Sequence, residues 1–192
     1  DNAFDGPILI THWGLSGPAI LKSSAWAAQW IFERNYQFNI LVSWVLQEEN
    51  QFREYFYELL TEHSKKKIIN LPIDLPQRLW CFILNRAGQN TEQPINELNK
   101  NQKNKLVELI VKMPFMVAGK TTFKEEFVTA GGVDEQSLNT NTLELKHCPG
   151  VYACGELLDV DGITGGFNFQ AAWSTANLVA NSIAYSPFSE NL

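Results

Sequence analysis

The segment with the strongest signal for chemistry is GVYACGELLDVDGITGGFNFQAAW, residues 150–173. It predicts a short apolar strand, the acids Glu156 and Asp159, and a glycine cluster that leads into a helix. Carboxylates just beyond a strand end suit the hydroxyls of a polyol such as a ribityl chain or a ribose. A helix start offers free N–H groups and a positive dipole end, which can stabilise charge on a flavin carbonyl. The segment therefore predicts half of a cofactor site.

Three stretches carry a family resemblance. ITHWGLSGPAIL (10–21), FVTAGGV (127–133) and the run 150–173 occur in this order and span nearly the whole chain. Together they resemble the BaiN/YhiN-type family of FAD- and NAD(P)-linked bacterial flavoproteins, a relative of the fumarate-reductase flavoprotein group. The resemblance implies an oxidoreductase that carries FAD, takes electrons from NAD(P)H and reduces an unsaturated or carbonyl-containing small molecule.

The resemblance also implies the residues that approach the cofactor. Gly155, Glu156 and Asp159 would lie on the ribityl side, whereas 165–168 and the pair at 131–132 would lie near the isoalloxazine ring. The implied cofactor-binding set is Gly131, Gly132, Gly155, Glu156, Asp159, Gly162, Thr164, Gly165, Gly166, Phe167 and Asn168. His12 and Ser16 are candidates for the substrate side. No residue stands out as the catalytic proton donor.

The chain departs from the family pattern at two places. No Gly-x-Gly-x-x-Gly follows a predicted strand, so the motif that would place the FAD pyrophosphate on a helix N-terminus is absent. The expectation is that this chain is a C-terminal part which does not bind FAD or act alone. Relatives often carry a histidine before the glycine pair, whereas Lys124, Glu125 and Glu126 stand here. A fumarate-type substrate clamp is therefore not expected.

The expected fold class is mixed α/β (α+β). A β-rich domain, 1–46 and 115–140, is interrupted by a three-helix insert at 47–114. The segment 141–192 follows as the C-terminal strand, loop and helix of a Rossmann-like FAD-binding domain whose N-terminal βαβ unit is missing.

Periodicity and turn residues predict the individual elements. Strands are expected at 7–11, 38–45, 115–117, 143–145 and 150–154, with 120–133 extended and 150–154 buried on both faces. Helices are expected at 18–35, where Ser16 would be the cap, and at 50–66, 75–87, 98–113 and 167–182, while the polar link 89–99 is expected to be exposed. The predicted core of the insert is Phe52, Phe56, Leu59, Leu60, Leu79, Phe82, Ile83, Leu106, Leu109 and Ile110, and Tyr55, Tyr57 and Trp80 are also assigned to it.

Composition limits the partners. The 21 acidic and 15 basic residues give a formal net charge of -6, so the chain-wide charge argues against nucleic acid. Apolar runs fall far short of the roughly 20 residues of a spanning helix. Cys81, Cys148 and Cys154 form neither a CxxC pair nor a set with histidines, so neither a disulfide framework nor a metal site is expected. A cytoplasmic location is the simplest interpretation, and the absence of Met or signal-peptide features at Asp1 suggests a piece of something longer.

The sequence also allows three other interpretations. The pattern Gly14-Leu15-Ser16-Gly17 beside His12 invites a hydrolase interpretation, but a nucleophile elbow needs glycine where Pro18 stands. A second hypothesis is a non-enzymatic module that binds a partner through an exposed apolar face of the 50–66 helix. A third is one half of a split flavoenzyme, which a large apolar surface around 151–153 and 167–180 would favour; alone, such a chain is expected to self-associate.

Overall fold

The computed structural model describes residues 3–120, 128–162 and 166–185. The chain divides into two compact units, Gln37–Ala118 on the one hand and Asp1–Tyr36 with Gly119–Leu192 on the other. The described residues form six α-helices and two small antiparallel sheets of two strands each. The mixed α/β class is therefore confirmed, while the Rossmann-like character of the C-terminal segment stays a prediction. None of the described helices has the length and apolar character needed to cross a membrane.

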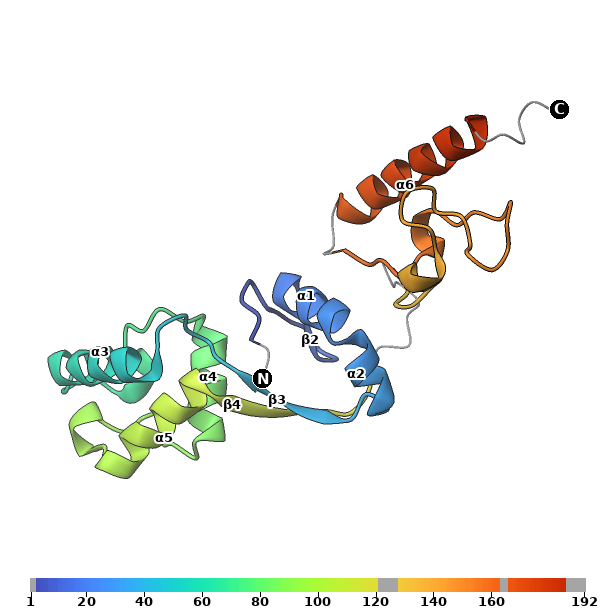
Figure 1. The fold of residues 1–192 in the computed structure, drawn as a ribbon. Helices are drawn as coiled ribbons and strands as arrows, with labels where there is room; N and C mark the ends of the chain where they lie inside the picture. Colours follow the sequence, from blue (N-terminus) through green and yellow to red (C-terminus); the bar gives the residue numbers. More distant parts are fainter. Residues whose placement is uncertain (1–2, 121–127, 163–165, 186–192) are drawn as a thin grey trace. The chain divides into compact units, whose positions relative to one another are not determined.

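The unit 37–118, called the helical unit below, combines three helices with a β-ribbon (Figure 1). Its elements are β3 (Phe38–Val42), α3 (Glu49–Glu62), α4 (Gln77–Arg86), α5 (Lys100–Val111) and β4 (Met113–Val117). The two strands pair antiparallel, with Phe38 opposite Val117 and Val42 opposite Met113. The three expected helices are present. α4 and α5 are shorter than expected at both ends, whereas α3 begins one residue earlier and ends four residues earlier than expected. β3 ends at Val42 instead of continuing to residue 45.

A capping box fixes the start of α5. Asn99 Oδ1 accepts a hydrogen bond from the Gln102 N–H, and Gln102 Oε1 accepts one from the Asn99 N–H, both at 2.9 Å. Two N–H groups that would otherwise lack partners at the helix start are thereby satisfied.

The core of the helical unit lies among its three helices. Trp80 is fully buried on α4; its ring meets Phe56 edge-on at 6.5 Å, and its Nε1 donates to the Ile68 carbonyl at 3.0 Å. The predicted core is confirmed with one exception, Phe82, which is 42% exposed. Tyr55 is also exposed, because it lies on the outward face of α3, whereas Tyr57 is partly buried.

The expectation that the link 89–99 is exposed holds for only part of it, because Gln89, Ile95 and Leu98 are buried. Two short 3-10 turns, η1 (Ile68–Asn70) and η2 (Ile95–Glu97), lie against each other. The Ile68 N–H donates to the Gln93 carbonyl at 2.9 Å, and the Ile95 N–H donates to the Lys66 carbonyl at 3.0 Å. Because the two turns satisfy each other's backbone groups, Ile68, Ile95 and Leu98 can be buried without leaving backbone N–H and C=O groups unpaired away from water.

The N-terminal segment contains a short hairpin and two helices. β1 (Leu9–Ile10) pairs antiparallel with β2 (Leu15–Ser16), so the expected strand 7–11 shrinks to two exposed residues. Ser16 therefore does not cap the next helix. That position is taken by Gly17, whose φ is 98° and where a Cβ would lie 2.9 Å from the Leu9 nitrogen.

The single helix expected over 18–35 is two helices, α1 (Pro18–Trp26) and α2 (Ala28–Glu33). Just before the break, the hydroxyls of Ser23 and Ser24 donate to the carbonyls of Ile20 and Leu21. Such hydrogen bonds back to the preceding turn compete with the helical ladder and weaken it. As expected, Asn35 follows the end of α2, with a left-handed φ of 50°.

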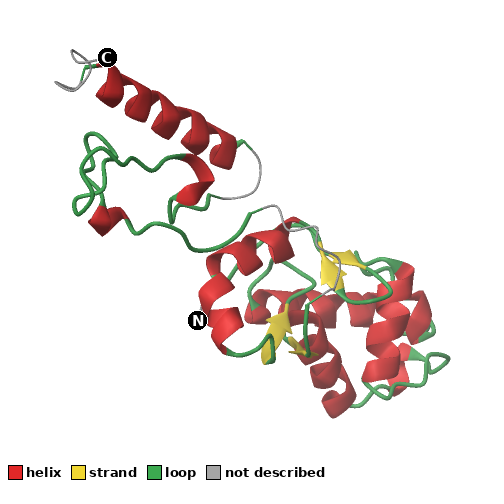
Figure 2. Cartoon of the chain, turned by 90° about the vertical axis from the view of Figure 1, so that its right-hand side faces the viewer, coloured by secondary structure: helices red, strands yellow, loops and turns green. Residues whose placement is uncertain are grey.

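Most of the C-terminal segment 128–162 is loop, and it is followed by α6 (Phe167–Ala184) (Figure 2). Two 3-10 turns, η3 (Glu135–Ser137) and η4 (Gly155–Leu157), interrupt the loop. α6 begins at the expected residue and ends two residues later than expected. Of the stretch 120–133, residues 121–127 lie outside the described residues and 128–133 form no regular strand.

The strands expected at 143–145 and 150–154 are only isolated antiparallel bridges, Leu138 with Leu145 and Glu144 with Tyr152. Left-handed turns at Leu143 and Gly150 keep the pairing short. The stretch 150–154 is not buried on both faces either: Ala153 is buried, whereas Val151 is 48% exposed. An apolar run is buried on both faces only where neighbouring strands cover it. Among the described residues, this run takes part in an isolated β-bridge and in no regular strand.

Candidate functional site

The loop 155–162 is anchored on α6 at its beginning. The Gly155 N–H donates to Thr175 Oγ1 at 2.9 Å, and the Thr175 hydroxyl donates to the Ala171 carbonyl at 2.7 Å. Gly155 has a φ of 68°, a conformation that favours glycine. Thr175 was not among the predicted site residues. Its spacing from Asn168 could have indicated it, because the two residues are seven positions apart and residues seven apart lie on the same face of a helix.

The end of the same loop is held by Asn168. The Gly162 N–H donates to Asn168 Oδ1 at 2.7 Å, and Asn168 Nδ2 donates to the Gly162 carbonyl at 3.4 Å. A Cβ at Gly162 would lie 2.9 Å from the Cβ of Phe167, so only glycine allows this close approach. Three predicted site residues, Gly162, Phe167 and Asn168, are thus brought together. Thr164 and Gly165 lie outside the described residues.

The glycine pair at 131–132 also lies against this loop. The Val133 N–H donates to the Leu157 carbonyl at 2.8 Å, and the Asp159 N–H donates to the Val133 carbonyl at 3.1 Å. A Cβ at Gly132 would lie 2.5 Å from the carbonyl carbon of Leu158, so Gly132 serves close backbone packing. Gly131, in contrast, has a φ of 99° and open space where a Cβ would be. Residues 131–133, 155–159, 162 and 166–168 therefore belong to one local cluster, called the glycine loop below.

The glycine loop presents groups that a flavin could use. Glu156 and Asp159 are exposed, and neither carboxylate has a hydrogen-bond or ion-pair partner among the described residues. The N-cap of α6 is Gly166, which has no side-chain cap and open space around its Cα. Exposed carboxylates beside an uncapped helix start suit a polyol joined to a ring carbonyl. The described residues thus fit the ribityl and ring part of FAD but offer nothing that matches a pyrophosphate grip.

The substrate-side candidates lie on the β1–β2 hairpin. His12 is exposed and lies edge-on to the Trp13 ring, with centroids 4.2 Å apart. Ser16 is partly buried within β2. Neither geometry identifies a proton donor, so both residues stay predictions. Within the described ranges, no three His, Cys, Asp or Glu side chains gather where they could hold a metal ion.

One face of α6 exposes large apolar side chains. Phe169 is 66% exposed and Trp173 is 68% exposed, and their rings stack with centroids 6.3 Å apart. Phe167, Ile183 and Tyr185 are exposed as well, and no residue of this 18-residue helix is buried. Exposed aromatic rings that stack on each other, as those of Phe169 and Trp173 do, are typical of a contact with another polypeptide or a ligand.

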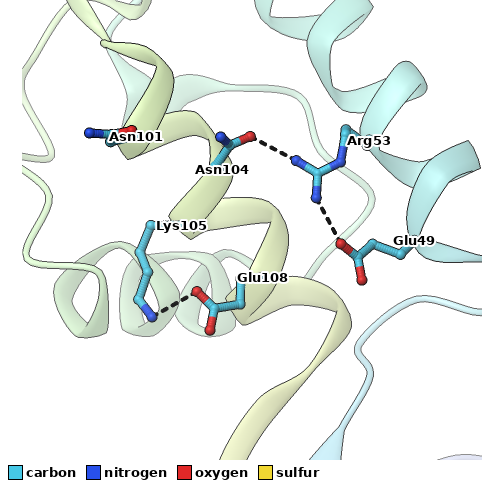
Figure 3. Close-up of a pocket in the computed structure, with 6 residues that line it drawn as sticks. All are labelled: Glu49, Arg53, Asn101, Asn104, Lys105 and Glu108. Carbon is cyan, nitrogen blue, oxygen red and sulfur yellow. Dashed lines mark hydrogen bonds and ion pairs between the residues drawn. The ribbon is translucent and has the colours of Figure 1, made fainter.

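A shallow groove between α3 and α5 is lined by charged and amide side chains (Figure 3). Arg53 donates to Asn104 Oδ1 and to Glu49 Oε1, both at 2.7 Å, and Lys112 Nζ lies 2.7 Å from Glu49 Oε2. The hydrogen bond from Lys112, and then that from Arg53, lowers the pKa of the Glu49 carboxyl, while Glu49 raises the pKa of Lys112. Because these groups satisfy one another, the groove is a clamp between helices. The sequence pattern did not predict this clamp, because its members come from two helices far apart in the chain.

Comparison with protein-family models identifies one family. The model of the HI0933-like protein barrel and H2TH domain matches residues 1–128. Similar curated proteins include the ribosomal RNA dihydrouridine synthase of Escherichia coli (strain K12), 33% identical over 170 residues, which are 88% of this chain and 40% of the relative. The Haemophilus influenzae protein of the same name is 31% identical over 188 residues, covering 95% of this chain and 43% of the relative.

A third relative is the 3-dehydro-bile acid delta(4,6)-reductase of Clostridium scindens, 29% identical over 184 residues, or 95% of this chain and 45% of the relative. The chain spans less than half the length of each of these three proteins. The finer BaiN/YhiN-type assignment and the link to the fumarate-reductase group stay predictions. The match over residues 1–128 covers two thirds of the sequence, and the chain therefore belongs to the HI0933-like family.

Proposed function

We propose that the chain is the flavin-covering, substrate-side part of an FAD-dependent reductase that uses NAD(P)H to saturate a carbon–carbon double bond conjugated to a carbonyl group. The observation that carries the proposal is the glycine loop, which Thr175 and Asn168 lock against the start of α6. Membership of the HI0933-like family supports it.

The relatives' names support this substrate class. Dihydrouridine is uridine whose ring double bond, conjugated to a carbonyl, has been saturated, and a delta(4,6)-reductase acts on double bonds that a 3-oxo group can activate. Both reactions add hydride to the electron-poor end of a conjugated system and a proton to the other carbon. The two substrates differ greatly in size, so the shared feature is the bond and not its surroundings.

The chain's own residues would bind and orient. Glu156 and Asp159 would accept hydrogen bonds from the ribityl hydroxyls, and the first-turn N–H groups of α6 would donate to a ring carbonyl and stabilise negative charge there. Asn168 and Thr175 would hold the loop backbone in place while this happens. When bound, FAD supplies the two-electron chemistry, and the protein supplies position and electrostatics.

A second candidate is one half of a split flavoenzyme, assembled with a separate nucleotide-binding polypeptide. The exposed aromatic face of α6 favours it, because a helix that buries no side chain needs some cover. The hypothesis of a non-enzymatic module has no such support. That hypothesis requires an exposed apolar face on α3. The large apolar side chains Phe52, Phe56, Leu59 and Leu60 of that helix are instead buried in the core.

The test is the visible absorbance of the purified chain after addition of excess FAD and desalting. It is run with and without co-expression of the part of the E. coli relative that this chain does not span. We expect flavin to be retained only in the co-expressed sample. Asp159→Asn should lower the retained flavin, whereas the matched control Asp161→Asn, an exposed acid of the same loop without an assigned role, should not.

The outcomes separate the hypotheses. Flavin retained only with the added part supports a cofactor site to which this chain contributes one half. Absence of flavin in both samples, with both polypeptides folded and associated, would contradict the oxidoreductase proposal. Equal loss in the Asp159 and Asp161 variants would show that the loop's total charge, and not a specific carboxylate, governs binding.

A further inference from the structure

We propose that the helical unit carries an RNA-docking surface, made by Lys65, Lys66, Lys67 and Lys100, which holds the backbone of an RNA substrate. This inference rests on the proposed function and on the likeness to two ribosomal RNA dihydrouridine synthases, and it narrows the substrate class to a uridine within RNA. The four residues are called the lysine surface below.

The first observation is an uneven division of charge. The helical unit, residues 37–118, holds ten of the fifteen Lys and Arg residues but nine of the 21 Asp and Glu residues. The rest of the chain holds five basic and twelve acidic residues. RNA is a polyanion, so the acidic remainder repels it. If this chain contacts RNA, electrostatics directs that contact to the helical unit, a distinction that the chain-wide charge of -6 hides.

The second observation is that the lysine run lies on a rigid turn. All three of its side chains are exposed. The Lys66 carbonyl accepts from the Ile95 N–H at 3.0 Å, and the Ser64 carbonyl accepts from the Asn96 N–H at 2.9 Å. The indole of the buried Trp80 holds the next residue, Ile68. Because the backbone is already ordered, binding a phosphate would order only the lysine side chains.

The third observation concerns which lysines are available. Lys67 pairs with Glu92, whereas Lys65, Lys66 and Lys100 have no carboxylate within ion-pair distance among the described residues. A cation without an internal partner keeps its full charge for a ligand, and neutralising a phosphate releases counterions from the RNA. These three side chains are therefore the main electrostatic contribution of the surface.

Lys100 extends the surface from the turn to a helix start. α3 ends and α5 begins at the same end of the helical unit (Figure 1), and the bond between Ser64 and Asn96 joins the two regions. Lys100 is the first residue of α5, followed by the exposed amide side chain of Asn101. Lysines contact phosphates, while exposed amides can reach sugars or base edges. Glu62 and Glu97 flank the surface and limit its extent.

The experiment measures RNA binding by fluorescence anisotropy. The probe is a fluorescein-labelled hairpin of ribosomal RNA sequence with uridine in its loop, and the full 192-residue chain is titrated at several salt concentrations without FAD. The test variant is Lys65→Glu/Lys66→Glu/Lys100→Glu. The control, Lys22→Glu/Lys105→Glu/Lys146→Glu, makes the same change in net charge at lysines that already have partners.

We expect the unmodified chain to bind with a steep salt dependence, and the test variant to bind about tenfold or more weakly. Its slope of log affinity against log salt should fall by about two, since each lost phosphate contact removes roughly 0.7 for single strands. The control should stay within about twofold of the unmodified chain. Circular dichroism verifies that the variants keep their helices, and the milder Lys65→Gln/Lys66→Gln/Lys100→Gln replaces a test variant that does not fold.

Two results would overturn the inference. Absence of RNA binding by the unmodified chain at low salt rules out an RNA-docking surface, and equal weakening by the test and control variants rules out this location. Because the assay contains no flavin and needs no turnover, failure here leaves the reduction of a small conjugated carbonyl intact. Failure of the flavin experiment, in turn, does not affect this measurement.

Discussion

The helical unit and the C-terminal segment differ in how they are held together. Eighteen buried hydrophobic residues from three helices, two turns and a strand form one core in the helical unit. Among the described residues of the C-terminal segment, the buried hydrophobic ones are Leu138, Ala153 and Leu158, and the long helix α6 contributes none of them. The first region is stabilised by its own core, whereas the described part of the second is held mainly by hydrogen bonds and close glycine packing.

The candidate site lies in the less well packed of these two regions. Every described residue of the glycine loop belongs to the weakly packed region, and its geometry rests on single contacts such as Asn168 with Gly162. Functional loops are commonly the least stable part of a structure. A ligand bound at the loop would then stabilise it, because ligand binding adds to the stability of the bound state.

Truncation of Trp80 should give the largest effect and tests the idea of a self-sufficient core. Trp80→Ala removes a fully buried ring and one of the two donors to the Ile68 carbonyl, which keeps the hydrogen bond from the Leu71 N–H. We expect a loss of about 3–5 kcal/mol, the usual range for a large aromatic in a core. Urea unfolding followed by circular dichroism measures it. Phe82→Ala, on the same helix but 42% exposed, is the control and should cost much less; similar losses in both would contradict the described core.

The same two residues show what the sequence could and could not predict. Helical periodicity placed α4 and most of its buried side chains correctly. However, Trp80 and Phe82 were both assigned to the core, and side chains two residues apart on a helix point in different directions. The structure buries Trp80 and exposes Phe82. The Ile68 carbonyl, which accepts from the Trp80 indole, is twelve residues away along the chain and leaves no periodic signal.

Gly132→Ala should give the next largest effect and tests the contact that joins 131–133 to the glycine loop. The added Cβ would lie 2.5 Å from the Leu158 carbonyl carbon and 2.6 Å from the Asp159 nitrogen, both backbone atoms that cannot move aside cheaply. We expect a local cost of about 1–3 kcal/mol, as for other overpacked sites. Hydrogen exchange at the amides of Val133 and Asp159 measures it, because both take part in the affected bridge.

Gly166→Ala is the matched control for this change. Gly166 has a φ of -72° in the helical region, and no atom lies near its added Cβ. Alanine should therefore be neutral or slightly stabilising there, by up to about 1 kcal/mol. Faster exchange at Val133 in the Gly166 variant would contradict the assignment of the Gly132 effect to a steric contact.

For the site, the cofactor-binding roles of the predicted residues stay predictions, but the structure shows contacts among them that the sequence did not predict. Gly162 and Asn168 are hydrogen-bonded to each other. The missing side chain of Gly132 makes room for the backbone of its own chain at Leu158 and Asp159. A glycine in the sequence indicates that some group packs closely against the backbone, but it does not indicate whether that group is a cofactor or another part of the chain. The prediction that 150–154 is buried on both faces was wrong for a similar reason. Burial depends on neighbouring segments, and a linear pattern does not contain them.

Polar replacement of the α6 aromatics should change stability little but association strongly. Phe169→Ser/Trp173→Ser alters two side chains that are about two-thirds exposed, so we expect each to shift the free energy of unfolding by no more than about 0.5 kcal/mol. Sizing over a range of concentrations should show self-association of the unmodified chain and less of it in the variant. A clean monomer at all concentrations would contradict the idea that this face needs cover, and Tyr55→Ser, at an exposed site of the well-packed unit, is the control.

The smallest expected effect concerns the clamp between α3 and α5. Hydrogen bonds from Lys112 and Arg53 hold the pKa of Glu49 below its ordinary 4.5. A carboxyl whose pKa is lower in the folded chain stabilises the fold above its unfolded pKa, and this contribution is lost as the pH falls through its folded pKa. The urea midpoint of the helical unit should therefore drop modestly below about pH 4.5, and Glu49→Gln should flatten part of that drop. Glu54→Gln, on the same helix without a basic partner in the described chain, should leave the profile unchanged. If both variants behave alike, the clamp contributes nothing specific and the stability of this unit comes from its core alone.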